Sequence, residues 1–395
     1  MPLRRRWTAM FSNRLPGHAE INALSRAVAS LRAAGTAFVD LTESNPTRVG
    51  LPYPADLLSA AASDRALCYD PQPFGQRTAR EAVSADYARR GVAVDPECIV
   101  LSASTSEAYS WLFKLLCNPG ESVLIPQPSY PLFEHLTRLE SVRTVPYRLE
   151  YHGRWEIDFD GITAAPDDVR AVLLVSPNNP TGSYVTAREA DTLAAICRER
   201  GWAMVSDEVF AEYVLDAQSP ATEIALRTKV LSFTLGGASK ALGLPQVKLA
   251  WTIVHGPVKE RIDALSRLEL IADTFLSVNT PIQVAAADLF RRGAAIRGAI
   301  HERVSRNLAT ARDVVRGYPA CYVLPVEGGW SLVVRVPATR SEELLAIGLL
   351  QNAHVLVHPG FFFDLPHEAF VVVSLLPPEN VFADAFGRTL RYASA

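Results

Sequence analysis

The rest of this chain is best understood from residues 231–251, which read Leu231-Ser-Phe-Thr-Leu-Gly-Gly-Ala-Ser-Lys-Ala-Leu-Gly-Leu-Pro-Gln-Val-Lys-Leu-Ala-Trp251. Lys240 stands among glycines and small residues, so its long amine emerges from a backbone with little bulk around it. A lysine in partly apolar surroundings loses its proton more easily than one in water, and only the neutral amine forms a Schiff base. Taken alone, the stretch is equally compatible with a surface lysine on a glycine turn.

Length and composition favour a large globular protein without metal or nucleic acid partners. The 395 residues, 49% of them hydrophobic, are enough for a large core and favour two domains. A net charge of -3 gives no electrostatic case for binding nucleic acid or an anionic membrane. The five scattered cysteines argue against a disulfide framework and a zinc site. No apolar run of about 18 residues and no secretory pattern are present, so we expect a cytoplasmic protein.

Short apolar runs alternate with helical patterns along most of the chain. Strands are predicted at 98–101, 122–126, 142–147, 171–175, 202–206 and 229–233, and helices at 76–91, 106–117 and 187–200. Apolar strands of this length between helices are typical of a parallel sheet covered on both faces. We therefore predict an α/β fold with a large domain over residues 47–290.

The pattern changes after a long helical region at 257–317. Strands are predicted at 321–324, 330–335, 354–357 and 370–375, with a helix at 341–351. This predicts a small α+β domain over residues 291–395, completed by the N-terminal segment 1–46. That segment contains a predicted helix at 18–34 and a short strand at 38–41.

Two further stretches place polar side chains directly after predicted strands. In Val175-Ser-Pro-Asn-Asn-Pro-Thr-Gly-Ser183, the amide of Asn179 can donate to a ring oxygen, although many such sequences are simple loops. In Ala203-Met-Val-Ser-Asp-Glu-Val-Phe210, Asp207 ends a strand, where ligands of parallel sheets bind. An acid there can hold a proton on a heterocyclic nitrogen, or it can be an ordinary helix N-cap.

A third stretch, Leu101-Ser-Ala-Ser-Thr-Ser-Glu-Ala108, places small hydroxyl residues at the start of a predicted helix. Backbone N–H groups at a helix N-terminus, together with hydroxyls, make a site suited to phosphate. A capping box of Ser104 with Glu107 would explain the same residues.

In this order and spacing, the four stretches resemble the fold-type I pyridoxal-phosphate enzymes, and specifically the class I/II aminotransferases. The resemblance extends from Asp40-Leu-Thr-Glu-Ser-Asn-Pro46 to the strand at 370–375. It implies a large domain with a mainly parallel seven-stranded sheet, pyridoxal 5′-phosphate as cofactor, and a homodimer with shared active sites. The implied reaction moves an amino group between an amino donor and a 2-oxo acid through an aldimine at Lys240.

The resemblance also implies roles for individual residues. Lys240 matches the lysine that binds the cofactor, Asp207 the acid paired with the pyridine nitrogen, and Asn179 the donor to the ring hydroxyl. Tyr130, in Pro128-Ser-Tyr-Pro131, matches the aromatic residue stacked on the ring. The residues that fall at the phosphate are Ser104, Thr105, Ser106 and Ser239, joined by Tyr69 from a neighbouring subunit. Ser44 falls where the family has a glycine close to the substrate.

Three positions depart from the family pattern. Lys248 stands where most members have an arginine for the phosphate, which keeps the charge but loses the bidentate fork. Phe210 stands where many members have a tyrosine on the ring hydroxyl. Val372 stands where members that act on α-amino acids have an arginine for the α-carboxylate.

The missing arginine leaves several reactions open. Arg335, His358 or backbone amides could bind the carboxylate instead, or the substrate could be an amine or amino sugar without one. The same cofactor could also serve a lyase or decarboxylase. Regulators of this fold carry a DNA-binding domain ahead of it, and the residues before Asp40 are too few for one. The amino donor, the acceptor and the pathway are not specified by the sequence.

Overall fold

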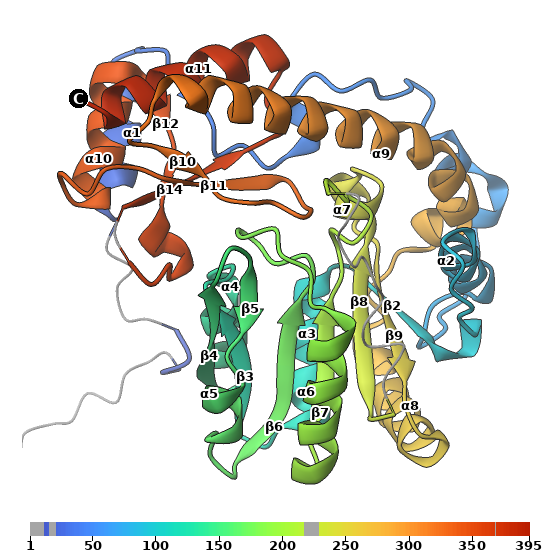
Figure 1. The fold of residues 1–395 in the computed structure, drawn as a ribbon. Coiled ribbons are helices and arrows are strands. Elements are labelled where there is room, and N and C mark those ends of the chain that lie inside the picture. Colours follow the sequence, from blue (N-terminus) through green and yellow to red (C-terminus); the bar gives the residue numbers. More distant parts are fainter. Residues whose placement is uncertain (1–11, 16–20, 217–228, 368) are drawn as a thin grey trace, which may run out of the picture.

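A computed structural model describes residues 12–15, 21–216, 229–367 and 369–395. These form a large part built on one sheet and a smaller α+β part above the ends of its strands (Figure 1). The eight strands lie in the order β2-β9-β8-β7-β6-β3-β4-β5. Their bounds are β2 Ile99–Ser102, β3 Ser122–Gln127, β4 Arg143–Tyr151, β5 Trp155–Ile157, β6 Val169–Val175, β7 Ala203–Asp207, β8 Ser232–Gly237 and β9 Ala250–His255.

The sheet is mainly parallel, as predicted, and the α/β fold class is confirmed. Strands β4, β3, β6, β7 and β8 run parallel, whereas β9 is antiparallel to both of its neighbours. The expected seven strands become eight because β5 folds back on the end of β4 as a short antiparallel edge strand. Both β5 and β9 were missed as strands by the apolar pattern.

Helices cover both faces of this sheet, and the strand sequences explain why. In β6, Val172 and Leu174 pack in a different apolar cluster from Ala171 and Leu173, because alternate side chains point to opposite faces. One cluster includes residues of α5 and α6, and the other includes residues of α3, α4 and α8. The helices of this part are α2 Arg77–Arg89, α3 Thr105–Leu116, α4 Leu132–Leu139, α5 Phe159–Thr163, α6 Ala187–Arg200, α7 Ala238–Ala241 and α8 Val258–Phe275.

The smaller part contains a four-stranded antiparallel sheet in the order β10-β11-β14-β13. The N-terminal segment lies against it, because β1 (Val39–Asp40) pairs with β12 (Val355–Leu356). Its other elements are α1 Ala23–Ala33, β10 Tyr322–Val323, β11 Ser331–Arg335, α10 Glu342–Gly348, β13 His358–Pro359, β14 Phe370–Ser374 and α11 Glu379–Ala393.

One long helix, α9 (Thr280–Val314), runs along the top of the molecule in Figure 1. Its 35 residues continue through position 290, where we divided the chain into large and small domains. The division into 1–46, 47–290 and 291–395 therefore stays a prediction. Among the described residues, no helix is both long and apolar enough to cross a membrane.

Close packing leaves no room for a side chain at Gly236, in the stretch 231–251. It lies on β8 directly opposite Trp251 on β9, and a Cβ at this glycine would overlap the indole ring. The indole is itself held by Tyr87, whose hydroxyl accepts a 3.3 Å hydrogen bond from Nε1 of Trp251. The nearest atom to a Cβ at the adjacent Gly237 is 3.5 Å away, an ordinary contact.

We therefore expect Gly236→Ala to destabilise the fold and Gly237→Ala to be tolerated. Overpacking of a close core contact costs about 1–3 kcal/mol. The thermal unfolding midpoint of Gly236→Ala should fall clearly below that of Gly237→Ala, measured on both proteins under the same conditions. Equal midpoints would contradict this explanation of Gly236.

Candidate active site

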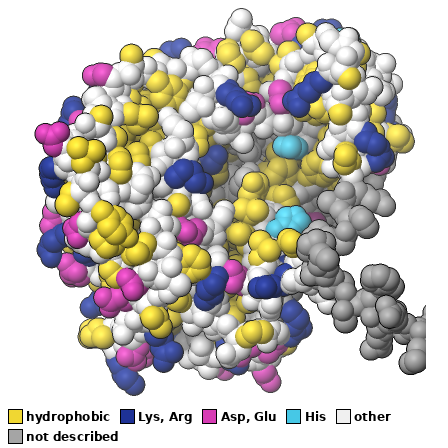
Figure 2. Space-filling view, turned by 180° about the vertical axis from the view of Figure 1, so that it is seen from behind, with side chains coloured by type: hydrophobic (Ala, Val, Ile, Leu, Met, Phe, Trp, Pro, Cys, Tyr) yellow, Lys and Arg dark blue, Asp and Glu magenta, His cyan; other side chains and the backbone are white. Residues whose placement is uncertain are grey.

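A cavity of about 280 Å³ lies where the carboxyl ends of the central strands meet the smaller part. Such crevices at strand ends are where ligands bind in open α/β sheets. From the side opposite to Figure 1 the molecule is hollowed, and apolar and histidine side chains lie in the hollow (Figure 2). Predicted site residues that line the cavity are Ser44, Thr105, Ser106, Tyr130, Asn179, Asp207, Phe210, Ser239, Lys240 and His358, together with Val372.

Lys240 lies on α7, directly after β8, and its half-buried side chain faces the cavity. Nζ lies 4.8 Å from the ring centre of Trp330 and 5.4 Å from that of Phe210. It is 3.5 Å from the carbonyl oxygen of Ser44. Burial lowers the pKa of Lys240 to about 8, although Asp207 and Glu43 partly oppose this change. A substantial fraction of the amine is therefore neutral near pH 8, as a nucleophilic amine requires.

Asp207 ends β7, the parallel neighbour of β8, and its carboxylate is fixed by two donors. The hydroxyl of Tyr109 donates to Oδ2 at 3.1 Å, and the backbone N–H of Val209 donates to Oδ1 at 3.2 Å. Burial raises the pKa of Asp207 to about 6, while these two hydrogen bonds and Lys240 act in the opposite direction. A cation placed in the cavity beside this carboxylate would favour its ionised form.

The two asparagines of the loop after β6 have different environments. Asn178 is buried, and its amide bonds Pro128, Ser129 and Thr181. Asn179 instead faces the cavity, and its Oδ1 accepts a 3.2 Å hydrogen bond from the hydroxyl of Ser331 on β11. Its Nδ2 has no hydrogen-bond partner among the described residues, so it is available to donate into the cavity.

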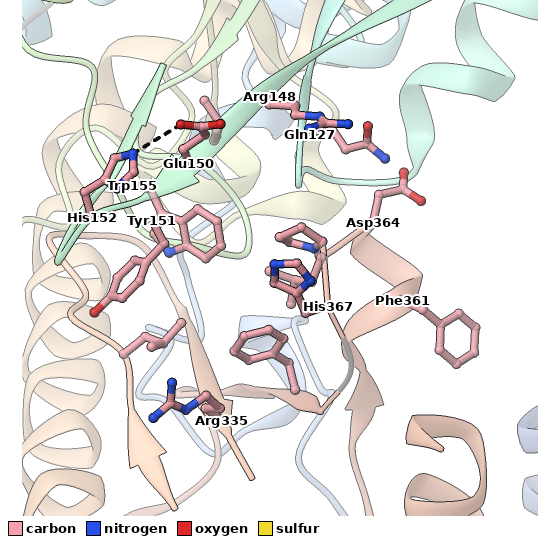
Figure 3. Close-up of a pocket in the computed structure, with 15 residues that line it drawn as sticks. Gln127, Arg148, Glu150, Tyr151, His152, Trp155, Arg335, Phe361, Asp364 and His367 are labelled. Carbon is pink, nitrogen blue, oxygen red and sulfur yellow. Dashed lines mark hydrogen bonds and ion pairs between the residues drawn. The ribbon is translucent and has the colours of Figure 1, made fainter. Parts of the chain in front are cut away.

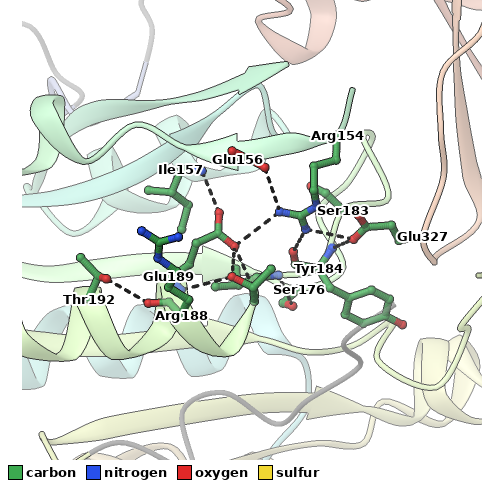
Figure 4. A network of polar contacts seen from close by, with 12 residues as sticks. Arg154, Glu156, Ile157, Ser176, Ser183, Tyr184, Arg188, Glu189, Thr192 and Glu327 are labelled. Carbon is green, nitrogen blue, oxygen red and sulfur yellow. Dashed lines mark hydrogen bonds and ion pairs between the residues drawn. The ribbon is translucent and has the colours of Figure 1, made fainter. Parts of the chain in front are cut away.

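An ion-pair network holds this loop between the two parts of the chain (Figure 4). Arg154 bonds Glu327 through Nε at 3.0 Å and the carbonyl of Tyr184 through Nη2 at 2.8 Å. Glu327 accepts in turn from the backbone N–H of Tyr184 at 2.7 Å. Gly182, inside the loop, accepts backbone hydrogen bonds from Glu327 and Gly328. The position of Asn179 thus depends on residues from both parts.

The start of α3 faces the cavity with Thr105 and Ser106. Within the described chain their backbone N–H groups have no hydrogen-bond acceptor, as expected in the first turn of a helix. Ser104 is the N-cap and accepts from the N–H of Glu107 at 3.1 Å, so its hydroxyl is used inside the helix start. The side chain of Glu107 bonds the N–H of Ala103, and the expected reciprocal capping box is therefore incomplete.

Besides Ser104, three predicted residues do not line this cavity. Arg335 lines a separate cavity of about 780 Å³ with Arg148 and His367 (Figure 3), because it is four residues, or about 13 Å, along β11 from Ser331. Lys248 is exposed and has a left-handed backbone, with φ of 52°. Tyr69 is 75% exposed and borders a groove that also contains Leu276.

Several cavity residues were not anticipated from the sequence, and three of them contact predicted site residues. Tyr109 lies four residues after Thr105 and therefore on the same face of α3, a spacing that could have identified it. Trp330 and Ser331 come from the smaller part, about 90 residues after Lys240, and no local motif signals their position. Tyr109 contacts Asp207, Trp330 contacts Lys240, and Ser331 contacts Asn179.

Comparisons with known proteins identify the family of this chain. A family model for aminotransferase class I and II matches residues 54–381. The glutamate–pyruvate aminotransferase of Haemophilus influenzae is 24% identical over 376 residues, covering 92% of each chain. The valine–pyruvate aminotransferase of Mycobacterium tuberculosis is 24% identical over 356 residues, covering 89% of each.

Solved structures show the same fold. An alanine aminotransferase from Pyrococcus furiosus superposes with a TM-score of 0.84 at 21% identity, covering 94% of this chain and 95% of that one. A Thermus thermophilus aspartate aminotransferase mutant gives 0.82 at 22% identity, covering 97% and 99%. Since the family model spans most of the sequence, this chain belongs to the class I and II aminotransferases and is an enzyme of the transaminase type.

Proposed function

We propose that this enzyme binds pyridoxal 5′-phosphate in the Lys240 cavity and transfers an amino group from an amino acid to a 2-oxo acid. The observation that carries the proposal is that Lys240, Asp207 and Asn179 line one cavity. Hydrogen bonds orient the side chains of Asp207 and Asn179. The alternative, a lyase or decarboxylase on the same cofactor, is an outcome of the experiment below.

The uncommitted donors of the cavity fit this cofactor. Nδ2 of Asn179 can donate to the ring hydroxyl, and the first-turn N–H groups of α3 can donate to phosphate, with the hydroxyls of Thr105, Ser106 and Ser239. Bound there, the cofactor supplies a ring that withdraws electrons when a bond at the substrate Cα breaks. Tyr130 and Val209 line the cavity and can pack on the ring.

Asp207 keeps the ring nitrogen protonated. The donors Tyr109 and Val209 favour its carboxylate form, and a protonated ring nitrogen would favour it further through a charge-assisted hydrogen bond. Tyr109 thus acts through Asp207 and is a positioning residue. Burial raises the pKa of the Tyr109 hydroxyl well above its usual value, so it remains a donor at physiological pH.

Lys240 has two tasks at its Nζ atom. Its neutral amine would hold the cofactor covalently, and the same amine, when free, would take the proton from the substrate Cα. Burial of this amine, which lies beside the rings of Phe210 and Trp330, keeps its pKa low enough for a base. The carbonyl of Ser44 orients the amine on its other side.

The phosphate site and the subunit arrangement form a second part of the proposal. The assignment of Lys248 to the phosphate rests on the family resemblance alone, because its side chain does not line the cavity. Tyr69 is exposed beside Leu67 and near Leu276, which are also exposed. This surface supports a homodimer in which Tyr69 reaches the partner's phosphate site. Five free cysteines support a cytoplasmic location.

The names of the relatives favour pyruvate as one acceptor. Both curated relatives described above are named for transfer to or from pyruvate. A half-reaction test comes first: an amino acid donor should convert the bound cofactor to its pyridoxamine form, which absorbs at shorter wavelength. Release of ammonia with an unchanged visible band would instead favour the lyase.

Lys240→Ala, reconstituted with pyridoxal phosphate, should lose the visible band of the covalently held cofactor. Borohydride should no longer fix cofactor to the chain, as measured by the mass of the intact protein. The matched control is Lys248→Arg, which should keep both signals because Lys248 lies outside the cavity. A borohydride-fixed cofactor in Lys240→Ala would mean that another lysine is the nucleophile.

Ser331→Ala should weaken cofactor binding and shift the pH at which the visible band changes. The amide of Asn179 loses the hydrogen bond that orients it, a contribution of about 0.5–1.5 kcal/mol. Ser331→Thr keeps the hydroxyl and should restore both properties. If Ser331→Ala has the cofactor dissociation constant and spectral titration of the wild type, then Ser331 does not position Asn179.

A further inference from the structure

Position 372 lacks the family's usual arginine, and the cavity has few other groups for a substrate carboxylate. Among its described lining residues, only Lys240 and His358 can carry a positive charge. We propose that His358 binds the α-carboxylate of the substrate, and that the substrate has one carboxylate and an uncharged, apolar side chain. This inference rests on the proposed function and specifies the substrate class of the same site.

The strand register places His358 where the carboxylate partner is missing. His358 on β13 lies directly opposite Val372 on β14, and Val372 lies opposite Val333 on β11. Directly opposed residues of antiparallel strands have side chains on the same face, with Cβ atoms about 4.5–5.5 Å apart. The imidazole therefore stands beside the position from which an arginine at 372 would extend.

The ring of His358 is fixed by packing but is not hydrogen-bonded. Its centre lies 5.9 Å from that of Phe362 and 5.6 Å from that of Phe363, and the latter contact is edge-on. Neither ring nitrogen has a hydrogen-bond partner in the described part of the chain, and the residue lines the cavity. A mostly buried imidazole without a protein partner can bond a ligand at no cost to the fold.

The charges around His358 make it a titratable rather than a permanent cation. Burial lowers its pKa, which Asp40 on β1 partly offsets. Asp40 is itself bonded to Thr42, and on α10 the carboxylate of Glu342 accepts from the N–H groups of Phe361 and Phe370. Lys240 is the other cationic side chain among the described residues that line the cavity.

An arriving carboxylate reverses this balance. It favours the imidazolium, so substrate binding takes up one proton from solvent. The protonated fraction of free His358 falls tenfold for each pH unit above its pKa. Carboxylate affinity should fall with the same slope as pH rises, until the neutral imidazole is the only remaining partner.

The rest of the cavity wall determines the side chain that fits. Leu132, Phe133 and Leu136 of α4 line it together with Phe363 and Val372. A second carboxylate against this wall would be desolvated without a cationic partner from the described lining residues, which is strongly unfavourable. Amino acids with aliphatic or aromatic side chains should therefore be preferred over aspartate and glutamate as donors.

The first experiment measures binding of 4-methylpentanoate, a carboxylate that cannot react, to the cofactor-loaded enzyme. Calorimetry in buffers of different ionisation enthalpy gives affinity and proton uptake across pH. The variants are His358→Gln and His358→Phe, the second of which preserves ring packing with Phe362 and Phe363. His152→Gln is the matched control, because His152 is exposed on the surface outside this cavity.

Above the pKa of free His358, the wild type and His152→Gln should bind the probe with uptake of about one proton and a tenfold loss of affinity per pH unit. Both His358 variants should bind at least tenfold more weakly at low pH, with no uptake attributable to the imidazole. Wild-type affinity and proton uptake in both variants would overturn the proposal. A visible cofactor band that is normal in every protein keeps this outcome distinct from failure of the proposed function.

A second experiment tests substrate class and the position of the charge. The wild type should show higher kcat/KM with leucine or phenylalanine than with aspartate or glutamate, and His358→Gln should raise KM more than it lowers kcat. Val372→Arg in the His358→Gln background should restore carboxylate binding without its pH dependence. Equal use of dicarboxylic and apolar donors would refute the assigned substrate class.

Discussion

The site depends on two opposite charges held in one poorly solvated cavity. Burial disfavours the charged forms of both Lys240 and Asp207, and each partly compensates the other. Their relative placement follows from the sheet. Asp207 ends β7 opposite Leu235 of β8, and β8 then leads into the helix that carries Lys240. The close packing of Gly236 against Trp251 fixes the end of β8, just before the lysine.

The orientation of the cavity's polar groups depends on the smaller part of the chain. Ser331 bonds Asn179 across the boundary, and Trp330 covers the amine of Lys240. The ion pair of Arg154 with Glu327 holds the end of the Asn179 loop through Tyr184. Preorganised donors contribute more in a water-excluded site than in solution, since they need no reorientation during reaction. Separation of the two parts would leave the Asn179 amide and the Lys240 amine without these contacts, whereas Tyr109 and Val209 would still hold the carboxylate of Asp207.

Strand ends explain which parts of the site the sequence could predict. Lys240, Asp207 and Asn179 each follow an apolar strand, and neighbouring parallel strands bring their carboxyl ends together. That Arg335 lines a separate cavity could not be predicted, because the sequence does not specify how far along a strand the cavity extends. Trp330 and Ser331 are brought in by long-range packing, which has no local pattern. The strand β9 was missed because it follows Lys240 after only a short helical turn.

The row Val333, Val372 and His358 determines the electrostatics of the carboxylate site that we propose. An arginine is charged at every physiological pH, so an arginine in this row would have to be desolvated even when no substrate is bound. A valine in the middle of the row removes that cost and continues the apolar wall formed by Phe363 and α4. The remaining imidazole can be neutral when the cavity is free and charged when a carboxylate arrives. Its contribution to binding is then smaller than that of a permanent cation by the free energy needed to protonate it. A site of this kind must recover affinity from apolar contact with the substrate side chain, which is what its wall provides.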